Sequence, residues 1–120
     1  SLTFDDVVLE LAARLELLPD AVAARTWLDP GIGFGKSPQL NALLVAGAGR
    51  LGFALERPVV VGPSRKRFLR QFVAADDPTE ADLDEATVAA CGEALAAGPM
   101  VVRVHNVALL HAALTAYNNE

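Results

Sequence analysis

Three short apolar runs, separated by helix-like segments, constrain the fold of this chain more than any other feature. They cover residues 27–28, 58–61 and 100–104. Runs that are nearly all apolar are typical of strands covered on both faces, as in parallel sheets. Strands that alternate with helices imply parallel pairing through right-handed crossovers. The sequence therefore predicts an α/β fold in which parallel strands alternate with helices.

The helical segments are predicted from apolar residues spaced three and four apart, together with capping signals. Ser37 before Pro38, the Thr79–Asp82 capping-box pattern and Asn106 mark three helix starts. The expected helices cover residues 4–18, 38–55, 65–73, 79–97 and 107–117.

Composition restricts the class of protein. The 120 residues are 52% hydrophobic and 21% charged, which is typical of a globular domain or of part of a larger one. The net charge of −5 argues against a general binder of nucleic acid or anionic membranes. A single cysteine, Cys91, excludes an internal disulfide and a Cys-rich zinc site, and its Ala-rich surroundings predict a buried, inert thiol.

The sequence also bears on location. No apolar run reaches the roughly 18 residues needed to span a membrane, and no signal-peptide pattern is present. We therefore expect a cytoplasmic protein without a membrane or nucleic-acid partner. The first residue is Ser1 rather than Met, which predicts a fragment or a processed chain.

Unusual polar residues follow each apolar run at its carboxyl end, over residues 29–36, 62–67 and 103–106. The carboxyl ends of parallel strands meet at one edge of a sheet, where α/β proteins bind ligands, so these groups are expected to share a site. Arg103 and His105 are two residues apart and should point to the same face of the last strand. Val102 and Val104 should then face the helices.

Each of these groups also has a purely structural interpretation. Arg103 could pair with a core carboxylate, His105 could bond a backbone carbonyl, and Asp29 could be an ordinary turn residue. The basic residues 64–67 could form a solvated helix start, although basic side chains there oppose the helix dipole and favour a bound anion. The coincidence at three successive strand ends favours a ligand site.

Two nucleotide-binding patterns are rejected. Residues 35–37 resemble the end of a P-loop, but the motif requires Gly at position 30, which is Pro. Residues 47–52 match the dinucleotide fingerprint, but only residues 53–57 separate them from the next strand, too few for a crossover helix.

At its three strand ends the chain resembles the dihydropteroate synthase family of folate biosynthesis. Residues 29–36, Asp-Pro-Gly-Ile-Gly-Phe-Gly-Lys, look like that family's pterin-site signature. Residues 62–66 look like its Gly-x-Ser-Arg-Lys loop, and residues 103–105 look like its closing Arg-x-His strand. The resemblance implies that residues 1–120 form the C-terminal portion of a pterin-binding TIM (β/α)8 barrel, with strands six, seven and eight.

The chain departs from the family pattern in two places. Asn106 stands where the family usually has Asp after the His, which puts the orientation of His105 in doubt. Residues 84–87 stand where the family usually has a Gly-Ser step.

The family's reaction is a condensation, and the resemblance implies roles in it. A 7,8-dihydropterin-6-ylmethyl diphosphate loses pyrophosphate, and the amine of p-aminobenzoate takes its place to give dihydropteroate. The buried carboxylate of Asp29 would accept hydrogen bonds from the pterin, and Lys66 would donate to its other edge. Arg103 would stack on the ring, and Arg103 and His105 would hold the departing diphosphate.

Further roles are implied by the same resemblance. Ser64 and Phe34 would line the p-aminobenzoate slot, with Arg65 nearby. Mg²⁺ is the expected cofactor, with its main ligand outside this chain, and the helices near 80–97 and 107–117 are expected to form a homodimer. The expected catalytic residues are Lys66, Arg103 and His105. The expected substrate-binding residues are Asp29, Gly33, Phe34, Gly62, Ser64, Arg65, Lys66, Arg103 and His105.

Two alternatives stay open. A related pterin-binding methyltransferase barrel would share the pterin aspartate but would not need the Ser-Arg-Lys loop or a diphosphate site. A non-catalytic homologue or fragment would explain Asn106 and the lost Gly-Ser step. We expect the 120-residue chain alone to be inactive, because the early strands of the barrel are missing from it.

Overall fold

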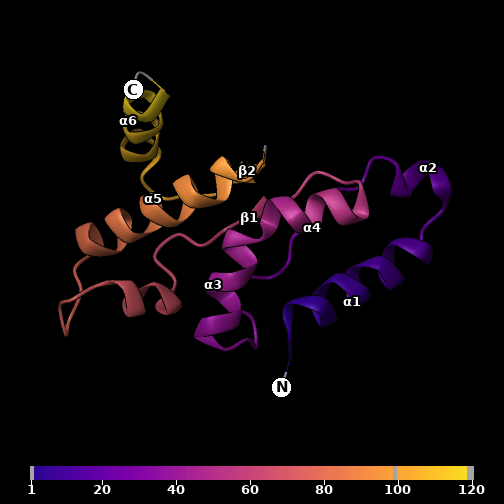
Figure 1. Cartoon of the computed structure of the whole chain (residues 1–120), viewed down its shortest axis with the longest axis horizontal. Helices are drawn as coiled ribbons and strands as arrows, with labels where there is room; N and C mark the ends of the chain where they lie inside the picture. The colour runs from indigo at the N-terminus through magenta and orange to yellow at the C-terminus, as the bar shows by residue number, and fades with distance from the viewer. Residues whose placement is uncertain (1, 99, 119–120) are drawn as a thin grey trace.

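The computed structural model describes residues 2–98 and 100–118, so Ser1, Pro99, Asn119 and Glu120 lie outside it. Helices predominate, and the strands are short (Figure 1). The helices are α1 (Phe4–Glu16), α2 (Asp20–Ala23), α3 (Pro38–Ala46), α4 (Ala48–Leu55), the 3₁₀ helix η1 (Arg67–Phe72), α5 (Glu80–Ala96) and α6 (Val107–Asn118). The strands are β1 (Val60–Val61) and β2 (Val101–Val102).

The predicted parallel order of the three apolar runs is confirmed. β1 pairs with β2 in parallel, with Val60 opposite Val101. The first run joins the other edge of β1 through a parallel bridge between Leu28 and Val59. All three strands are shorter than predicted, and the first is a single bridged residue.

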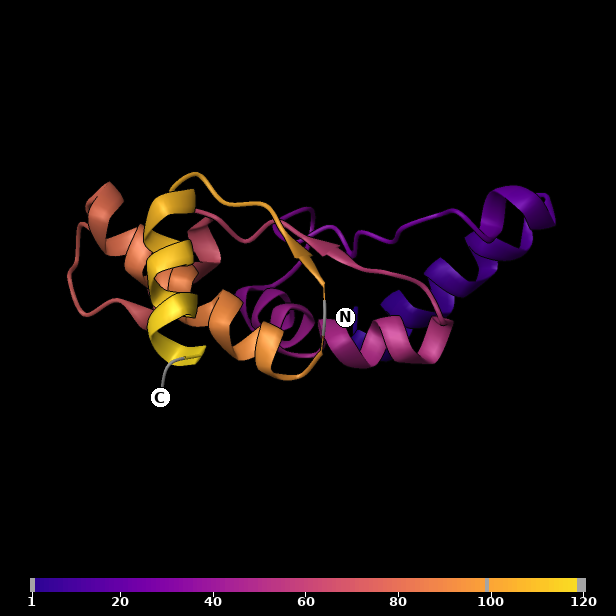
Figure 2. The ribbon, with the colours of Figure 1, turned by 90° about the horizontal axis from the view of Figure 1, so that it is seen from above.

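Helices cover one side of this small sheet. Seen from above, the strands and the loops that follow them run along one side, and α1, α3, α4 and α5 lie on the other (Figure 2). The interface between the two layers is apolar: Leu44, Leu51, Val61 and Leu69 are fully buried. The radius of gyration of 15.0 Å exceeds the roughly 14 Å of a compact domain of this length, in keeping with a sheet covered on one side.

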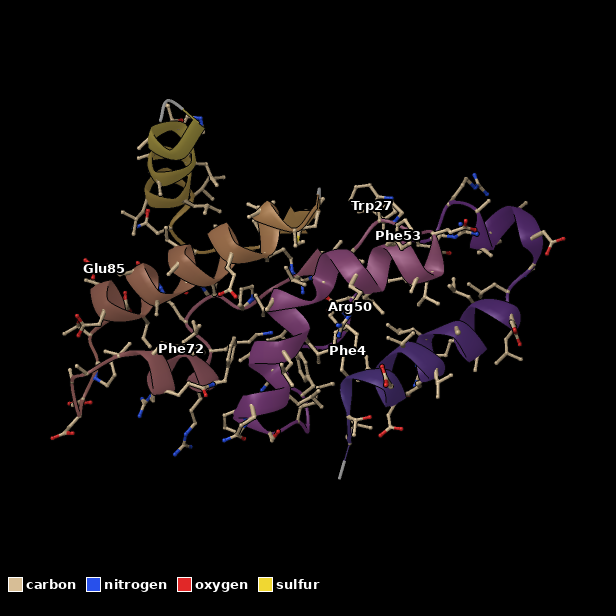
Figure 3. All side chains as sticks on the ribbon, viewed as in Figure 1. Phe4, Trp27, Arg50, Phe53, Phe72 and Glu85 are labelled. Atoms are coloured by element: carbon tan, nitrogen blue, oxygen red, sulfur yellow. The ribbon has the colours of Figure 1, made fainter. Side chains whose placement is uncertain are left out.

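The expected helix over residues 38–55 is two helices. The break falls at Gly47, where an added Cβ would lie 2.6 Å from the ring carbon Cε2 of Phe4. The same ring lies under the guanidinium of Arg50, 4.3 Å from it (Figure 3). The bend therefore accommodates an aromatic side chain from α1, a long-range contact that local sequence does not reveal.

The helix expected over residues 65–73 is also different: it is the 3₁₀ helix η1, and it begins at Arg67. A tight turn over residues 63–66 precedes it, with Lys66 N–H donating to the carbonyl of Pro63. Arg65 has a φ of +56° in this turn, which an α-helix cannot contain.

Helix α5 begins as predicted. Thr79 and Asp82 exchange the two hydrogen bonds of a capping box, at 2.9 and 3.1 Å. Asn106 caps α6 through a 3.0 Å bond from the Leu109 N–H. Cys91 is buried as predicted, and its burial raises the pKa of the thiol to about 11. In the described residues, none of the helices is long and apolar enough to cross a membrane.

Candidate functional site

The end of the first apolar run presents a carboxylate to the end of β2. Oδ2 of Asp29 accepts a 2.8 Å hydrogen bond from Nη2 of Arg103, and Oδ1 accepts one of 2.9 Å from the Gly31 N–H. The Asp29 side chain is 40% exposed, so the expectation of a buried carboxylate is wrong. It is exposed because, in the described residues, the sheet carries helices on one face only. Each carboxylate oxygen has a further lone pair for a ligand.

The glycine loop after Asp29 is held by two buried or half-buried side chains. Gly33 has a φ of +86°, and its N–H donates to Oδ1 of Asn41, which is 4% exposed. Nζ of Lys36 donates to the carbonyls of Gly31 and Phe34, at 3.0 Å each. Lys36 therefore ties down its own loop, consistent with the rejection of a P-loop.

Lys66 reaches from the end of β1 across to this glycine loop. Its Nζ donates a 2.6 Å hydrogen bond to the carbonyl of Ile32 and lies 5.1 Å from the centre of the Phe34 ring. An added Cβ on Gly33 would lie 3.0 Å from the Lys66 side chain, so the missing side chain makes room for the lysine.

The electrostatic surroundings of Lys66 lower the pKa of its ammonium. Burial lowers the pKa of the ammonium below its ordinary value, and the positive charges of Arg103 and Lys36 lower it further. The Asp29 carboxylate acts in the opposite direction. The charges of Asp29 and Arg103 thus both act on Lys66 across the strand ends.

Ser64 and His105 join the ends of β1 and β2. Oγ of Ser64 lies 2.7 Å from Nδ1 of His105 and accepts a 2.9 Å hydrogen bond from the His105 N–H. Ser64 is 8% exposed. A hydroxyl that serves both backbone and ring fixes the position of the imidazole.

The residues that follow β1 and β2 line a common hollow. A cavity of about 260 Å³ is lined by Gly62, Ser64, Lys66, Arg103, Val104 and His105. An adjoining hollow of about 490 Å³ includes Gly33, Phe34 and, again, Lys66. Val104 was expected to face the helices, but β2 ends at Val102 and the strict alternation of side chains ends with it.

Arg65 lies apart from this hollow. Its guanidinium contacts Asp84 on α5, with Nε 2.8 Å from Oδ1 and Nη2 3.2 Å from Oδ2. This contact raises the pKa of Arg65 and lowers that of Asp84. The structure therefore brings together the other expected site residues and directs the Arg65 side chain toward α5.

Sequence reasoning missed three buried polar residues: Asn41, Asp84 and Thr87. A signal was present, since Asp84 and Thr87 are three residues apart on the face of α5 that carries Cys91 and Ala94, where apolar residues are expected.

A larger hollow than either of these lies elsewhere. A mainly apolar cavity of about 850 Å³ opens between α3, η1 and α5, near Phe72 and Glu85 (Figure 3). No group of three or more His, Cys, Asp or Glu side chains that could hold a metal ion is found among residues 2–98 and 100–118.

Comparison with known proteins places this geometry in a family. Residues 3–105 match the model of the pterin binding enzymes. The chain is 43% identical over 83 residues to the dihydropteroate synthase of Staphylococcus haemolyticus, covering 69% of this chain and 30% of that protein. It is 35% identical over 121 aligned positions to the mitochondrial folate synthesis bifunctional protein of Arabidopsis thaliana, covering 89% of this chain and 22% of that protein.

Solved structures give the same result. The dihydropteroate synthase of Thermus thermophilus, in complex with 6HMPPP, superposes with a TM-score of 0.81 at 32% identity, over 96% of this chain and 45% of that one. The Xanthomonas albilineans enzyme with 4-aminobenzoic acid gives 0.80 at 34% identity, over 99% and 45%. The chain thus spans less than half the length of these relatives. Because the family model matches residues 3–105, most of its length, and because these relatives are 32–43% identical to it, this chain belongs to the pterin binding enzyme family.

Proposed function

We propose that this chain is the C-terminal part of a dihydropteroate synthase, contributing strands six to eight of a TIM barrel and much of the pterin and diphosphate site. The observation that carries the proposal is that Lys66, Arg103 and His105 line one hollow at the carboxyl ends of the parallel strands. The Asp29 carboxylate joins this group through its hydrogen bond from Arg103. Relatives that are named dihydropteroate synthase support it.

Recognition of the pterin is assigned to the two edges of the site. The Asp29 carboxylate accepts hydrogen bonds from the N–H groups of the ring, and the Lys66 ammonium donates to the carbonyl and nitrogen on the other edge. A charged hydrogen bond of this kind is worth roughly 1.5–3 kcal/mol. Lys66 already uses one of its three donors on the Ile32 carbonyl, so two remain for a ligand.

Bond breaking is assigned to the cationic side of the hollow. The C–O bond between the methylene carbon and the diphosphate breaks, and pyrophosphate carries away the electron pair. Arg103 and His105 stabilise that charge, with the imidazole held in place by Ser64. The amine of p-aminobenzoate then forms the new C–N bond and releases a proton to solvent.

The other parts of the proposal rest on the family. Phe34 and Ser64 line the p-aminobenzoate slot, and the protein is a cytoplasmic homodimer through α5 and α6. Mg²⁺ is the cofactor that the family implies, and its main protein ligand would lie outside this chain.

A chimeric enzyme tests this function. In the Thermus thermophilus synthase, the segment that superposes on this chain is replaced by this chain, and formation of dihydropteroate from the pterin diphosphate and p-aminobenzoate is measured. We expect activity from the chimera, no activity from the Asp29→Asn chimera, and none from the 120-residue chain alone. A folded chimera without activity would refute the proposal.

The methyltransferase alternative predicts a different binding profile. A methyltransferase site would bind a pterin equally well with or without a diphosphate. A synthase site should bind the diphosphate form more tightly, because Arg103 and His105 contact it. Calorimetric titration of the chimera with both compounds separates the two.

A further inference from the structure

The turn between β1 and η1 contains a residue that the turn itself disfavours. Lys66 N–H donates to the Pro63 carbonyl at 3.1 Å, so residues 63–66 form a tight turn. Its third residue, Arg65, has a φ of +56°. Turns with positive φ at this position usually carry Gly or Asn, because other side chains crowd the backbone there. An arginine in this place indicates that its side chain compensates for the strain.

Helix α5 supplies that compensation. The Arg65 guanidinium makes a two-pronged contact with Asp84, whose side chain is 8% exposed. The Arg65 N–H donates to Oγ1 of Thr87 at 3.2 Å. A third contact, 3.4 Å to Glu80, involves a carboxylate that is 79% exposed and contributes little.

The anchored residue lies between two residues of the site. On one side of it, Ser64 holds the His105 ring at 2.7 Å; on the other, Lys66 reaches the Ile32 carbonyl at 2.6 Å. A rotation of the Arg65 backbone would displace both side chains. Asp84 also receives a long contact, 3.5 Å, from the amide of Asn106, the residue after His105.

We propose that Asp84 is a positioning residue of this site: by anchoring Arg65 in its left-handed conformation, it places Ser64 against His105 and Lys66 across the hollow. The part played in the reaction rests on the proposed function, whereas the placement of the side chains does not. Asp84 is linked to the site through Arg65, which lies between Ser64 and Lys66, and through Asn106, which follows His105.

The imidazole of His105 reports this placement directly. The chain has two histidines, and His111 is exposed on α6, so the ¹⁵N shifts of the His111 ring serve as an internal reference. We expect Asp84→Asn and Arg65→Ala each to move the Nδ1 shift of His105 toward that of His111. Arg65→Gly should leave it near the wild-type value, because glycine adopts a positive φ without an anchor. Adding Arg65→Gly to Asp84→Asn should restore it.

Inorganic pyrophosphate provides the second measurement. We expect Asp84→Asn to weaken its binding about 10- to 100-fold, the loss that follows a displacement of site groups by about 1 Å. Glu80→Gln is the matched control, since it removes a carboxylate near Arg65 from the same helix, and it should change neither readout.

Unchanged His105 shifts in both Asp84→Asn and Arg65→Ala would overturn the proposal, even if the melting temperature fell, and so would failure of Arg65→Gly to restore them. If Asp84→Asn does not fold, the comparison of Arg65→Ala with Arg65→Gly decides. If the wild-type chain binds no pyrophosphate, that result counts against the proposed function. The ¹⁵N shifts of His105 would still decide whether Asp84 positions the site residues.

Discussion

Replacing Gly62 by alanine should impair the site while leaving the fold intact. Gly62 is buried at the end of β1, and an added Cβ would lie 3.0 Å from Nη2 and 3.2 Å from Nε of Arg103. The backbone of Gly62 does not have a positive φ, so alanine meets no strain there. The atoms in the way belong to a flexible side chain, and Arg103 will therefore move.

The expected magnitudes separate binding from stability. The ion pair with Asp29 has partners that are 62% and 40% exposed, so its loss should lower the free energy of unfolding by no more than about 1 kcal/mol. A ligand that loses a charged hydrogen bond to Arg103 should lose roughly 1.5–3 kcal/mol, about 10- to 150-fold in affinity.

Calorimetric titration with inorganic pyrophosphate and urea unfolding of the same samples measure the two effects. Gly92→Ala is the matched control, because Gly92 lies within α5 with nothing within 4 Å of its added Cβ. It should raise the free energy of unfolding by about 1 kcal/mol and leave affinity unchanged. If Gly62→Ala binds pyrophosphate with wild-type affinity, the inferred position of Arg103 is wrong. If Gly62→Ala loses well above about 1 kcal/mol of stability, the assumption that the Arg103 side chain moves aside is wrong.

Three further predictions concern the acid, the core and the pH dependence. In the chimera, Asp29→Asn should weaken pterin binding at least about 10-fold, the equivalent of one charged hydrogen bond, with a nearly unchanged melting temperature; equal affinity in calorimetry would remove the carboxylate from its role. Val61→Asp should unfold the chain, as circular dichroism would show, because Val61 is 0% exposed and the new charge has no partner. The hydrogen bonds from Arg65 lower the pKa of Asp84 from 3.8, so their stabilisation is present above about pH 4 and is lost as the pH falls further. Urea unfolding at a series of pH values should show this loss in the wild type and a smaller one in Asp84→Asn.

Features set by nearby residues were predictable from the sequence. The capping box at Thr79 and the cap at Asn106 depend on residues three apart, and both formed as expected. The parallel order followed from apolar runs alternating with helices. Because polar groups follow the strand ends, Asp29 and Arg103 were expected to lie close together. They do, although 74 positions separate them.

Features set by distant contacts were not predictable in this way. The bend at Gly47 depends on the ring of Phe4, and nothing in residues 38–55 marks one small residue as the break. The direction of the Arg65 side chain depends on Asp84, 19 positions away. The basic residues 64–67 alone therefore did not indicate that Arg65 would point toward α5. The exposure of Asp29 depends on what covers the inner face of the sheet, which local pattern does not encode.

Lys66 borders both hollows of the site, which makes their occupancies interdependent. A ligand in the smaller hollow that accepts a hydrogen bond from the Lys66 ammonium removes that donor from the larger hollow. A negatively charged ligand in either hollow stabilises the protonated amine, which both hollows share. By thermodynamic reciprocity, a ligand in one hollow must change the affinity of the other hollow for its own ligand by the same factor as the reverse. A single amine thus makes two binding equilibria one coupled system.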